Sequence, residues 1–329
     1  MIISRTPFRI SLFGGGTDYP AWSSKFGGTV IGTTIDKYCY INVRVLPPFF
    51  DHNHRIVWSK IELVNEIDEI EHPAVRSILT DYGITKGMEI AYNADLPARS
   101  GLGSSSSFIV GLLNALSALN GSMISKKKLA QEAIRLEQDV MKESVGCQDQ
   151  IWAAYGGINK INFRKDGSFN VSPIILTKQR KIDLHSSMML FFTGFSRHAS
   201  EIAATLIENI NKKERHLHQI HSFVEDALKI LQNSSSAIDD LGELLDQSWR
   251  MKRELANGVT TSNIDEIYNA GIEAGAIGGK LLGAGGGGFI LFIVQPENRE
   301  AVKRRLKKLI HVEFEFDTSG SKIEVFQPG

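Results

Sequence analysis

A segment rich in glycine and serine, residues 97–107, has the composition of a phosphate-binding loop. It reads PARSGLGSSSS and runs directly into an apolar stretch with helical spacing. The start of a helix offers unpaired backbone N–H groups and a partial positive charge, and preceding glycines let an anion approach that backbone closely. The serine hydroxyls add further donors and potential metal ligands. The segment therefore predicts an anion site, and phosphate is the anion that suits it.

The same segment differs from a Walker A loop. It lacks the Gly-Lys-Ser/Thr ending, and Arg99 is the one cation within it. Because no lysine is present to neutralise phosphate charge, a bound Mg²⁺ would have to help. A serine-capped helix after a flexible turn is the alternative interpretation of these residues.

A second glycine cluster follows the N-terminal apolar stretch, where residues 9–20 read RISLFGGGTDYP. A strand is expected to end in the three glycines and then to present a hydroxyl and the carboxylate of Asp18. A carboxylate suits the paired hydroxyls of a sugar, and glycines leave room for the ring. The alternative is that Asp18 only closes a turn, as aspartate often does.

A third cluster, residues 280–289, reads KLLGAGGGGF and formally matches GxGxxG through Gly283, Gly285 and Gly288. The dinucleotide fingerprint requires a strand before and a helix after the glycines. Here the next residues, 289–294, are FILFIV and predict a strand. We therefore reject an NAD site and expect either a ligand contact or a tight loop between domains.

The composition excludes several classes of protein. The chain has 329 residues with 37 basic and 37 acidic side chains, so its net charge is zero, which argues against nucleic acid as a partner. No apolar run approaches the roughly 18 residues of a membrane span, and Arg5 and Arg9 interrupt the N-terminal apolar residues. Two cysteines exclude a disulfide scaffold. We expect a soluble cytoplasmic protein without a membrane partner.

The elements that must position these clusters come in groups, strands together and helices together, which predicts an α+β fold. Strands are expected at residues 1–13, 29–35, 38–46, 55–64, 88–94, 157–163, 171–176, 187–193, 289–294, 313–316 and 322–326. Helices are expected at residues 73–82, 101–120, 125–143 (with Ser125 as N-cap), 147–155, 199–232, 237–256, 263–274 and 297–309, and a loop at 275–288.

The three glycine clusters, in their order along the chain, resemble the motifs of the GHMP kinase superfamily, which includes galactokinase, homoserine kinase and mevalonate kinase. The matching motifs are R-x-x-L-x-G, P-x-x-x-G-L-G-S-S and the C-terminal glycine cluster. The resemblance implies a ribosomal S5-like N-terminal domain, residues 1–178, and a ferredoxin-like C-terminal domain, residues 179–329. It also implies ATP bound with Mg²⁺ along the central loop, at Pro97, Arg99, Ser100, Gly101, Leu102, Gly103, Ser104, Ser105 and Ser106.

The resemblance extends to residues outside the loops. Asp149 lies where the family has its catalytic aspartate, which accepts or orients the proton of the attacking hydroxyl. Arg9 matches an arginine beside that aspartate, which would keep the carboxylate ionised and stabilise the transferring phosphoryl group. Glu137 matches the magnesium-binding glutamate, and Ser105 is the expected loop ligand, with Ser104 as the second choice.

The acceptor implied by the resemblance is a sugar that already carries a phosphate. Galactokinases have Glu-His where Gly15 and Gly16 stand, whereas GGGTDYP, GCQDQ at residues 146–150 and FTG at 192–194 resemble kinases of D-glycero-D-manno-heptose 7-phosphate. Those enzymes phosphorylate the anomeric oxygen in the synthesis of surface polysaccharide. The expected sugar phosphate contacts are Gly15, Gly16, Thr17, Asp18 and Arg197, the last from position and charge.

Three other functions remain open at this point. A related kinase could act on fucose or galactose, a sensor on the same fold could bind sugar and ATP without turnover, and an S5-like domain could bind RNA. The neutral net charge disfavours RNA, and the presence of Asp149, Arg9 and Glu137 argues against the sensor. The oligomeric state stays undetermined.

Overall fold

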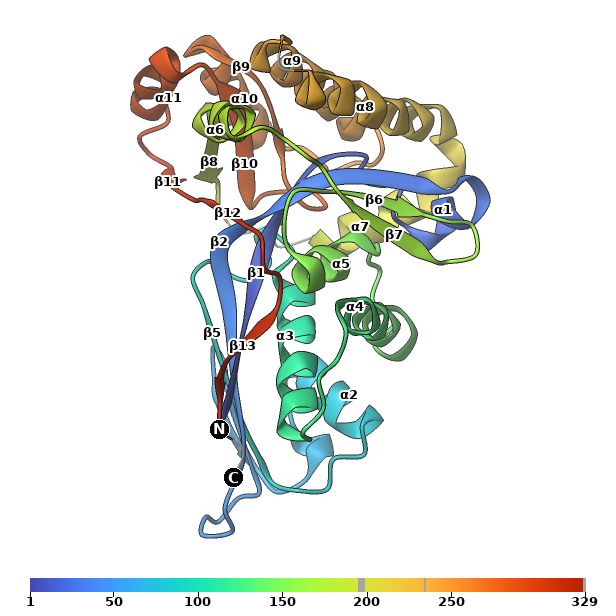
Figure 1. The fold of residues 1–329 in the computed structure, drawn as a ribbon, viewed down its shortest axis with the longest axis vertical. Coiled ribbons are helices and arrows are strands. Elements are labelled where there is room, and N and C mark those ends of the chain that lie inside the picture. The colour runs from blue at the N-terminus through green and yellow to red at the C-terminus, as the bar shows by residue number, and fades with distance from the viewer. Residues whose placement is uncertain (195–198, 234, 328–329) are drawn as a thin grey trace.

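The fold consists of two β-sheets, each covered by helices. The computed structural model describes residues 1–194, 199–233 and 235–327. The larger sheet contains the path β13-β1-β2-β5-β3-β4, with β6, β7 and β12 attached (Figure 1). Its strands are β1 (Ile2–Phe13), β2 (Gly28–Val45), β3 (His54–Val57), β4 (Ile61–Val64), β5 (Met88–Ala94), β6 (Asn159–Phe163), β7 (Phe169–Pro173), β12 (Phe316–Asp317) and β13 (Lys322–Phe326).

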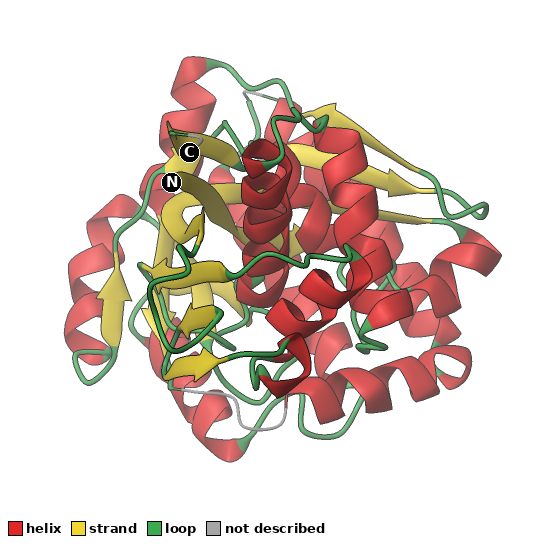
Figure 2. Cartoon of the chain, turned by 90° about the horizontal axis from the view of Figure 1, so that it is seen from below, coloured by secondary structure: helices red, strands yellow, loops and turns green. Residues whose placement is uncertain are grey.

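The smaller sheet has the order β11-β8-β10-β9. Its strands are β8 (Met188–Phe192), β9 (Ala276–Leu281), β10 (Phe289–Val294) and β11 (Ile310–Val312). The mixture of separate helices and strands around the sheets is visible in Figure 2 and confirms the predicted α+β class. The helices are α1 (Pro20–Phe26), α2 (Pro73–Asp81), α3 (Ser104–Leu119), α4 (Lys126–Arg135), α5 (Gln148–Tyr155), α6 (Lys178–Ser187), α7 (Ala199–Asn209), α8 (Glu214–Gln232), α9 (Ile238–Arg253), α10 (Ser262–Glu273) and α11 (Arg299–Arg305).

Helix α3 runs along one face of the larger sheet and contacts β1 and β2, with α4 and α5 beside it (Figure 1). Its apolar residues recur at helical spacing, and Phe108, Ile109, Leu112 and Leu116 are buried in the main core. Burial of this whole face anchors the helix against the sheet, because removing apolar surface from water is the main favourable term in folding. The N-terminus of α3 is therefore held rigidly, which a binding loop requires.

The strands predicted at residues 29–35 and 38–46 form one continuous strand, β2. Tyr38 pairs with Pro7 and Ile35 pairs with the next residue of β1, Phe8, so Asp36 and Lys37 form a bulge without interrupting the strand. A proline has no N–H to donate to a neighbouring strand, which makes this the natural position for the irregularity.

The strand predicted at residues 55–64 is instead a hairpin of β3 and β4. The Trp58 N–H donates to the Lys60 carbonyl at 2.8 Å and closes the turn. The alternation of the apolar residues Ile56, Trp58, Ile61 and Leu63 slips by one residue at this turn.

The loop predicted at residues 275–288 contains a strand, β9, in its first half. Gly278 and Gly279 lie inside the strand because neighbours approach too closely for a side chain. A Cβ on Gly278 would lie 2.0 Å from the Gly242 carbonyl oxygen of α9, and one on Gly279 would lie 2.7 Å from the Phe292 ring. These glycines serve close packing of α9 and β10 on the strand, not flexibility.

Several helices differ from their predicted bounds. The helix expected at 125–143 is α4, with Ser125 as N-cap as predicted, followed by a π-helical turn at Leu136–Val140. The stretch 199–232 is divided between α7 and α8 by a short 3-10 turn, Ile210–Lys212. Helix α6 was not predicted, and the helix expected at 297–309 is shortened to α11.

The C-terminal strands return to the first half of the chain. Strand β13 pairs with β1, and β12 pairs with β2. Residues 316–317 and 322–326 therefore pair into the larger sheet, although they fall within the range 179–329 predicted for the C-terminal domain. The predicted boundary at residue 178 stays a prediction for the rest of the chain.

Two further findings concern the expected environment. Both Cys39 and Cys147 are free thiols, so the described chain contains no disulfide. Among the helices of the described residues, none has the length and apolarity needed to cross a membrane.

Candidate active site

The candidate phosphate site is the loop that leads into α3. Gly101 and Gly103 have φ angles of +85° and +77°, in the left-handed region that glycine tolerates best. Gly103 is the N-cap, and no side chain caps the helix. The first N–H groups of α3 are thus left without a capping partner at the positive end of the helix dipole. This geometry agrees with the predicted anion site, while the ATP contacts themselves stay a prediction.

The loop is stabilised by its own polar groups. The Ser100 hydroxyl donates to the Pro97 carbonyl at 2.7 Å, and the Arg99 N–H donates to the Ser104 hydroxyl at 3.1 Å. Arg99 has a φ angle of +57° and an exposed side chain. Ser105 is exposed at the start of the helix, whereas Ser104 is buried and already accepts a bond within the loop. Ser105 is therefore better placed than Ser104 to reach a ligand.

The C-terminal glycine cluster packs directly on this loop. A Cβ on Gly101 would lie 2.5 Å from the Leu282 carbonyl oxygen, and one on Gly283 would lie 2.5 Å from the Gly101 Cα. The Phe289 N–H donates to the Ser100 carbonyl at 3.0 Å. Contacts this close require residues without side chains on both partners, which explains the glycines at both positions.

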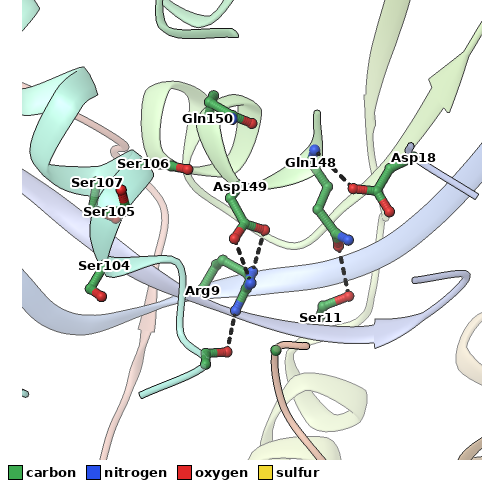
Figure 3. A network of polar contacts seen from close by, with 12 residues as sticks. Arg9, Ser11, Asp18, Ser104, Ser105, Ser106, Ser107, Gln148, Asp149 and Gln150 are labelled. Carbon is green, nitrogen blue, oxygen red and sulfur yellow. Dashed lines mark hydrogen bonds and ion pairs between the residues drawn. The ribbon is translucent and has the colours of Figure 1, made fainter. Parts of the chain in front are cut away.

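Arg9 and Asp149 form a bidentate ion pair beside the loop (Figure 3). Arg9 Nε donates to Asp149 Oδ1 at 2.7 Å, and Nη2 donates to Oδ2 at 2.6 Å. The third arm, Nη1, donates to the Gly101 carbonyl at 2.6 Å. The predicted proximity of Arg9 and Asp149 is confirmed, although the two residues lie on β1 and α5 and are 140 positions apart.

Asp149 stands directly in front of the first turn of α3. A Cβ on Gly103 would lie 3.3 Å from Asp149 Oδ2. The Asp149 side chain keeps 25% of its surface exposed, whereas that of Arg9 keeps 6%. A planar guanidinium held by two bonds to the carboxylate and one to the loop fixes the carboxylate orientation. The carboxylate is thus accessible to a ligand and has a fixed position relative to the loop.

Glu137 forms a buried polar cluster behind the loop. Its side chain is completely buried, and its carboxylate accepts bonds from Ser105 Oγ at 3.2 Å, from Ser106 Oγ at 2.8 Å and from Gln150 Nε2. Burial raises the pKa of Glu137 to about 7, and the negative charge of Asp149 contributes to the rise. The π-helical turn carries Glu137, and such turns are frequent at functional sites.

The cluster around Glu137 fits a Mg²⁺ ion. Its exposed side chain, Ser105, ends in a hydroxyl oxygen, and Gln150 Oε1 is buried without a hydrogen-bond partner. Oxygen atoms are the ligands that Mg²⁺ prefers. Within the described residues, no group of three or more His, Cys, Asp or Glu side chains could hold a metal. A single carboxylate with serine hydroxyls suits Mg²⁺, which usually keeps waters and takes phosphate oxygens as ligands. The predicted ligands Ser105 and Glu137 lie within hydrogen-bond distance of each other.

Asp18 closes the turn after β1 and lies close to Gln148 (Figure 3). Its carboxylate accepts bonds from the Gly16 N–H at 3.0 Å and from the Gln148 N–H at 3.4 Å, and Ser11 Oγ donates to Gln148 Oε1 at 2.7 Å. Burial raises the pKa of Asp18, and the charge of Asp149 raises it further. Asp18 therefore combines the turn-closing role with a position near the candidate catalytic pair.

The other predicted sugar contacts differ in how accessible they are to a ligand. Gly15 is partly exposed near Ser11 and Gln148, and Gly16 is buried. The Thr17 hydroxyl is fully buried and donates to the Gly14 carbonyl at 2.8 Å, so it stabilises the turn and is not available to a ligand. Arg197 lies outside the described residues.

Two glutamines of the site were not assigned a role from the sequence. Gln148 and Gln150 flank Asp149 and face different partners, Ser11 and Asp18 on one side and Glu137 on the other. One glutamine on each side of an aspartate, at the start of an otherwise apolar helix, was a signal that could have indicated them.

Two family models cover most of the site. The model described as GHMP kinases N terminal domain matches residues 65–157, and the one described as GHMP kinases C terminal matches residues 225–311. The two segments together make up more than half of the chain, and they contain the loop, Asp149, Glu137 and the C-terminal glycine cluster. The chain belongs to the GHMP kinase family.

Several relatives resemble the chain over nearly its full length. It is 27% identical over 318 residues to the D-glycero-alpha-D-manno-heptose 7-phosphate kinase of Campylobacter jejuni, with 93% of each chain covered. It is 26% identical to the L-fucokinase/L-fucose-1-P guanylyltransferase of Bacteroides fragilis, covering 94% of this chain and 36% of that protein. A crystal structure of a D-glycero-D-manno-heptose 1-phosphate kinase from Bacteroides thetaiotaomicron has a TM-score of 0.80 at 24% identity and covers 99% and 100% of the two chains, which supports the fold.

Proposed function

We propose that the chain is an ATP-dependent kinase that transfers the γ-phosphoryl group to the anomeric hydroxyl of a sugar phosphate. The acceptor we favour is D-glycero-D-manno-heptose 7-phosphate. The reaction would take place in the cytoplasm and give the 1,7-bisphosphate, a precursor of nucleotide-activated heptose for surface polysaccharide. The observation that carries the proposal is the Arg9–Asp149 pair, which is fixed to Gly101 at the head of α3 by the third guanidinium nitrogen.

In this proposal Asp149 receives or orients the proton of the acceptor hydroxyl. The paired guanidinium of Arg9 holds the carboxylate in a fixed orientation, and the exposed part of Asp149 is the part that an acceptor can reach. Phosphoryl transfer depends mainly on positioning and on stabilisation of charge. The N-terminus of α3, which no side chain caps, lies next to Asp149, and this arrangement would position the phosphate beside the carboxylate. Arg9 supplies positive charge beside the transferring group.

Ser105 and Glu137 would hold Mg²⁺. When bound, Mg²⁺ neutralises phosphate charge that the loop, with its single exposed arginine, leaves uncompensated. The Ser106 hydroxyl and the Gln150 amide orient the Glu137 carboxylate from the opposite side. Supporting groups of this kind fix a ligand in the orientation that a metal requires.

The acceptor would lie along the turn of residues 14–18, with Asp18 and the backbone of Gly15 nearest to it. The heptose assignment rests on the C. jejuni relative, whose printed name states that substrate, and on the GGGTDYP and GCQDQ segments. A fucose-type acceptor is the second candidate, because the B. fragilis fucokinase relative covers 94% of this chain.

An ADP-release assay with a panel of acceptors tests the proposal. The purified chain with MgATP is offered heptose 7-phosphate, heptose 1-phosphate, fucose and galactose. We expect turnover with heptose 7-phosphate and loss of it in Asp149→Asn, while the exposed control Asp51→Asn keeps wild-type rates. Turnover of fucose or galactose without heptose 7-phosphate would reject the heptose assignment. Binding of sugar and ATP without any ADP release would reject the kinase and favour a sensor.

The metal assignment has its own test. Ser105→Ala should raise the Mg²⁺ concentration needed for half-maximal turnover, and Ser104→Ala should change it less, because that hydroxyl is already engaged in the loop. A larger effect of Ser104→Ala would exchange the roles of the two serines.

A further inference from the structure

Lys252, near the C-terminal end of α9, reaches the glycine cluster that packs on the phosphate loop. Its ammonium donates to the carbonyls of Leu281, at 3.2 Å, and of Gly283. The side chain is half-buried, and the ammonium lies 5.9 Å from the centre of the Trp249 ring. The chain therefore places a lysine on the glycine cluster that packs against the loop, although the loop itself contains no lysine.

The position of Lys252 relative to the loop follows from two close contacts. Gly283, whose carbonyl accepts a bond from Lys252, lies against Gly101, because a Cβ on Gly283 would be 2.5 Å from the Gly101 Cα. The Gly101 carbonyl in turn accepts the bond from Arg9 at 2.6 Å. Arg9 thus binds the carbonyl of the loop glycine Gly101, and Lys252 binds the carbonyl of Gly283, the residue packed against that glycine.

The ammonium of Lys252 has no anionic partner within the described residues. An ammonium carries three donors, and the two bonds above go to neutral carbonyls, which leaves one donor and the full positive charge for a ligand. Burial and the charge of Arg9 lower the pKa of Lys252 to about 8, while Asp18 opposes that change. A partly buried cation without a counter-ion is unfavourable, and a bound anion would relieve that cost.

The second buried lysine of this region does not share these properties. Lys280 has only 5% of its surface exposed, and its ammonium donates to the Leu12 carbonyl at 2.8 Å, joining β9 to the end of β1. Lys280 is enclosed by protein, so among the two lysines Lys252 is the one that a ligand can reach.

We propose that Lys252 supplies the lysine that the phosphate loop lacks, and that its ammonium binds the γ-phosphate of the nucleotide across the contact between Gly101 and Gly283. The inference rests on the proposed kinase function and goes beyond it by assigning a nucleotide contact to α9. A lysine is a compact point charge, which suits a phosphate oxygen, and a charge-assisted hydrogen bond is stronger than a neutral one. The γ-phosphate alone distinguishes ATP from ADP, so Lys252 acts on that difference.

Calorimetric titration with the magnesium complexes of AMP-PNP and ADP tests the inference. Lys252→Met should weaken AMP-PNP binding by roughly 10- to 100-fold and ADP binding by less than about threefold. Lys252→Arg, which keeps the charge, should recover most of the affinity. The matched control is Arg250→Met on the same helix, since that side chain is 69% exposed and pairs with Asp246 on the surface. Both affinities should remain unchanged in the control.

The possible outcomes separate this inference from the proposed function. A wild-type chain that binds neither nucleotide would reject the kinase itself. A wild-type kinase whose Lys252→Met variant binds AMP-PNP normally, or loses both nucleotides equally, would reject only the role of Lys252. The role is also rejected if the variant raises the KM for the sugar phosphate while the ratio of the two nucleotide affinities is unchanged. Circular dichroism of each variant ensures that α9 is intact.

Discussion

Replacing the buried carboxylate at Glu137 with an amide should stabilise the metal-free protein and remove its response to Mg²⁺. The pKa of Glu137 rises from an ordinary value of 4.5 to about 7 because the charged form is desolvated. Each pKa unit corresponds to about 1.4 kcal/mol, so ionisation of Glu137 in the folded chain costs about 3 kcal/mol at neutral pH and above. The folded state binds this proton more tightly than the unfolded chain. The metal-free protein should therefore lose stability as the pH rises from about 4.5 through about 7.

The hydrogen bonds around Glu137 are compatible with glutamine at this position. The amide oxygen can accept the bonds from Ser106 and Gln150, and the amide nitrogen can donate to the Ser105 hydroxyl. Glu137→Gln should thus recover much of the cost of the buried charge. At about 2 °C per kcal/mol for a chain of this size, we expect a rise of about 2 to 6 °C in melting temperature in EDTA at pH 8.

The assay is thermal unfolding at pH 8 in EDTA and again with Mg²⁺ and AMP-PNP. The wild type should gain stability from the metal nucleotide, whereas Glu137→Gln should gain much less, because the carboxylate ligand is gone. Glu143→Gln, at an exposed position of the same segment, is the control and should behave like the wild type. The reasoning is refuted if Glu137→Gln melts below the wild type in EDTA, or if it keeps the full stabilisation by Mg²⁺ and AMP-PNP.

Three further outcomes are expected. Asp149→Asn should keep AMP-PNP affinity in calorimetry and lose about two to four decades of ADP release, the usual contribution of a general base; near-normal release would remove that role. Gly103→Ala should weaken AMP-PNP binding and lower stability in urea by about 1 kcal/mol or more, because φ is +77° and the new Cβ would lie 3.3 Å from Arg9 Cγ and Asp149 Oδ2; unchanged urea curves would contradict this. The affinity for AMP-PNP should fall as the pH rises through about 8, where Lys252 loses its proton; the neighbouring charged groups are Arg9, Asp18 and Lys280. A Lys252→Met variant should not show this fall in affinity.

The sequence by itself determined the local structure and the identity of the motifs. Strands β5 and β13 have the predicted bounds, because each is a short run of strand-forming residues between breakers. Helix α4 begins after Ser125 because the serine side chain accepts the Lys128 N–H. The order of the three glycine motifs was sufficient to indicate the GHMP kinase family. The pairing of Arg9 with Asp149 was expected from that resemblance and not from spacing, since 140 residues separate them.

Only the tertiary structure decided which residues from distant segments of the chain come into contact. Glycine in a sequence is compatible both with a flexible loop and with close packing, so Gly278 and Gly279 predicted a loop where α9 packs against a strand. The return of β12 and β13 to the larger sheet, the contact of Gln150 with Glu137 and the contact of Lys252 with Gly283 likewise have no local signal. The physical reason is that hydrogen bonds and close contacts between remote segments depend on how whole sheets and helices pack, whereas sequence patterns report the preferences of neighbouring residues.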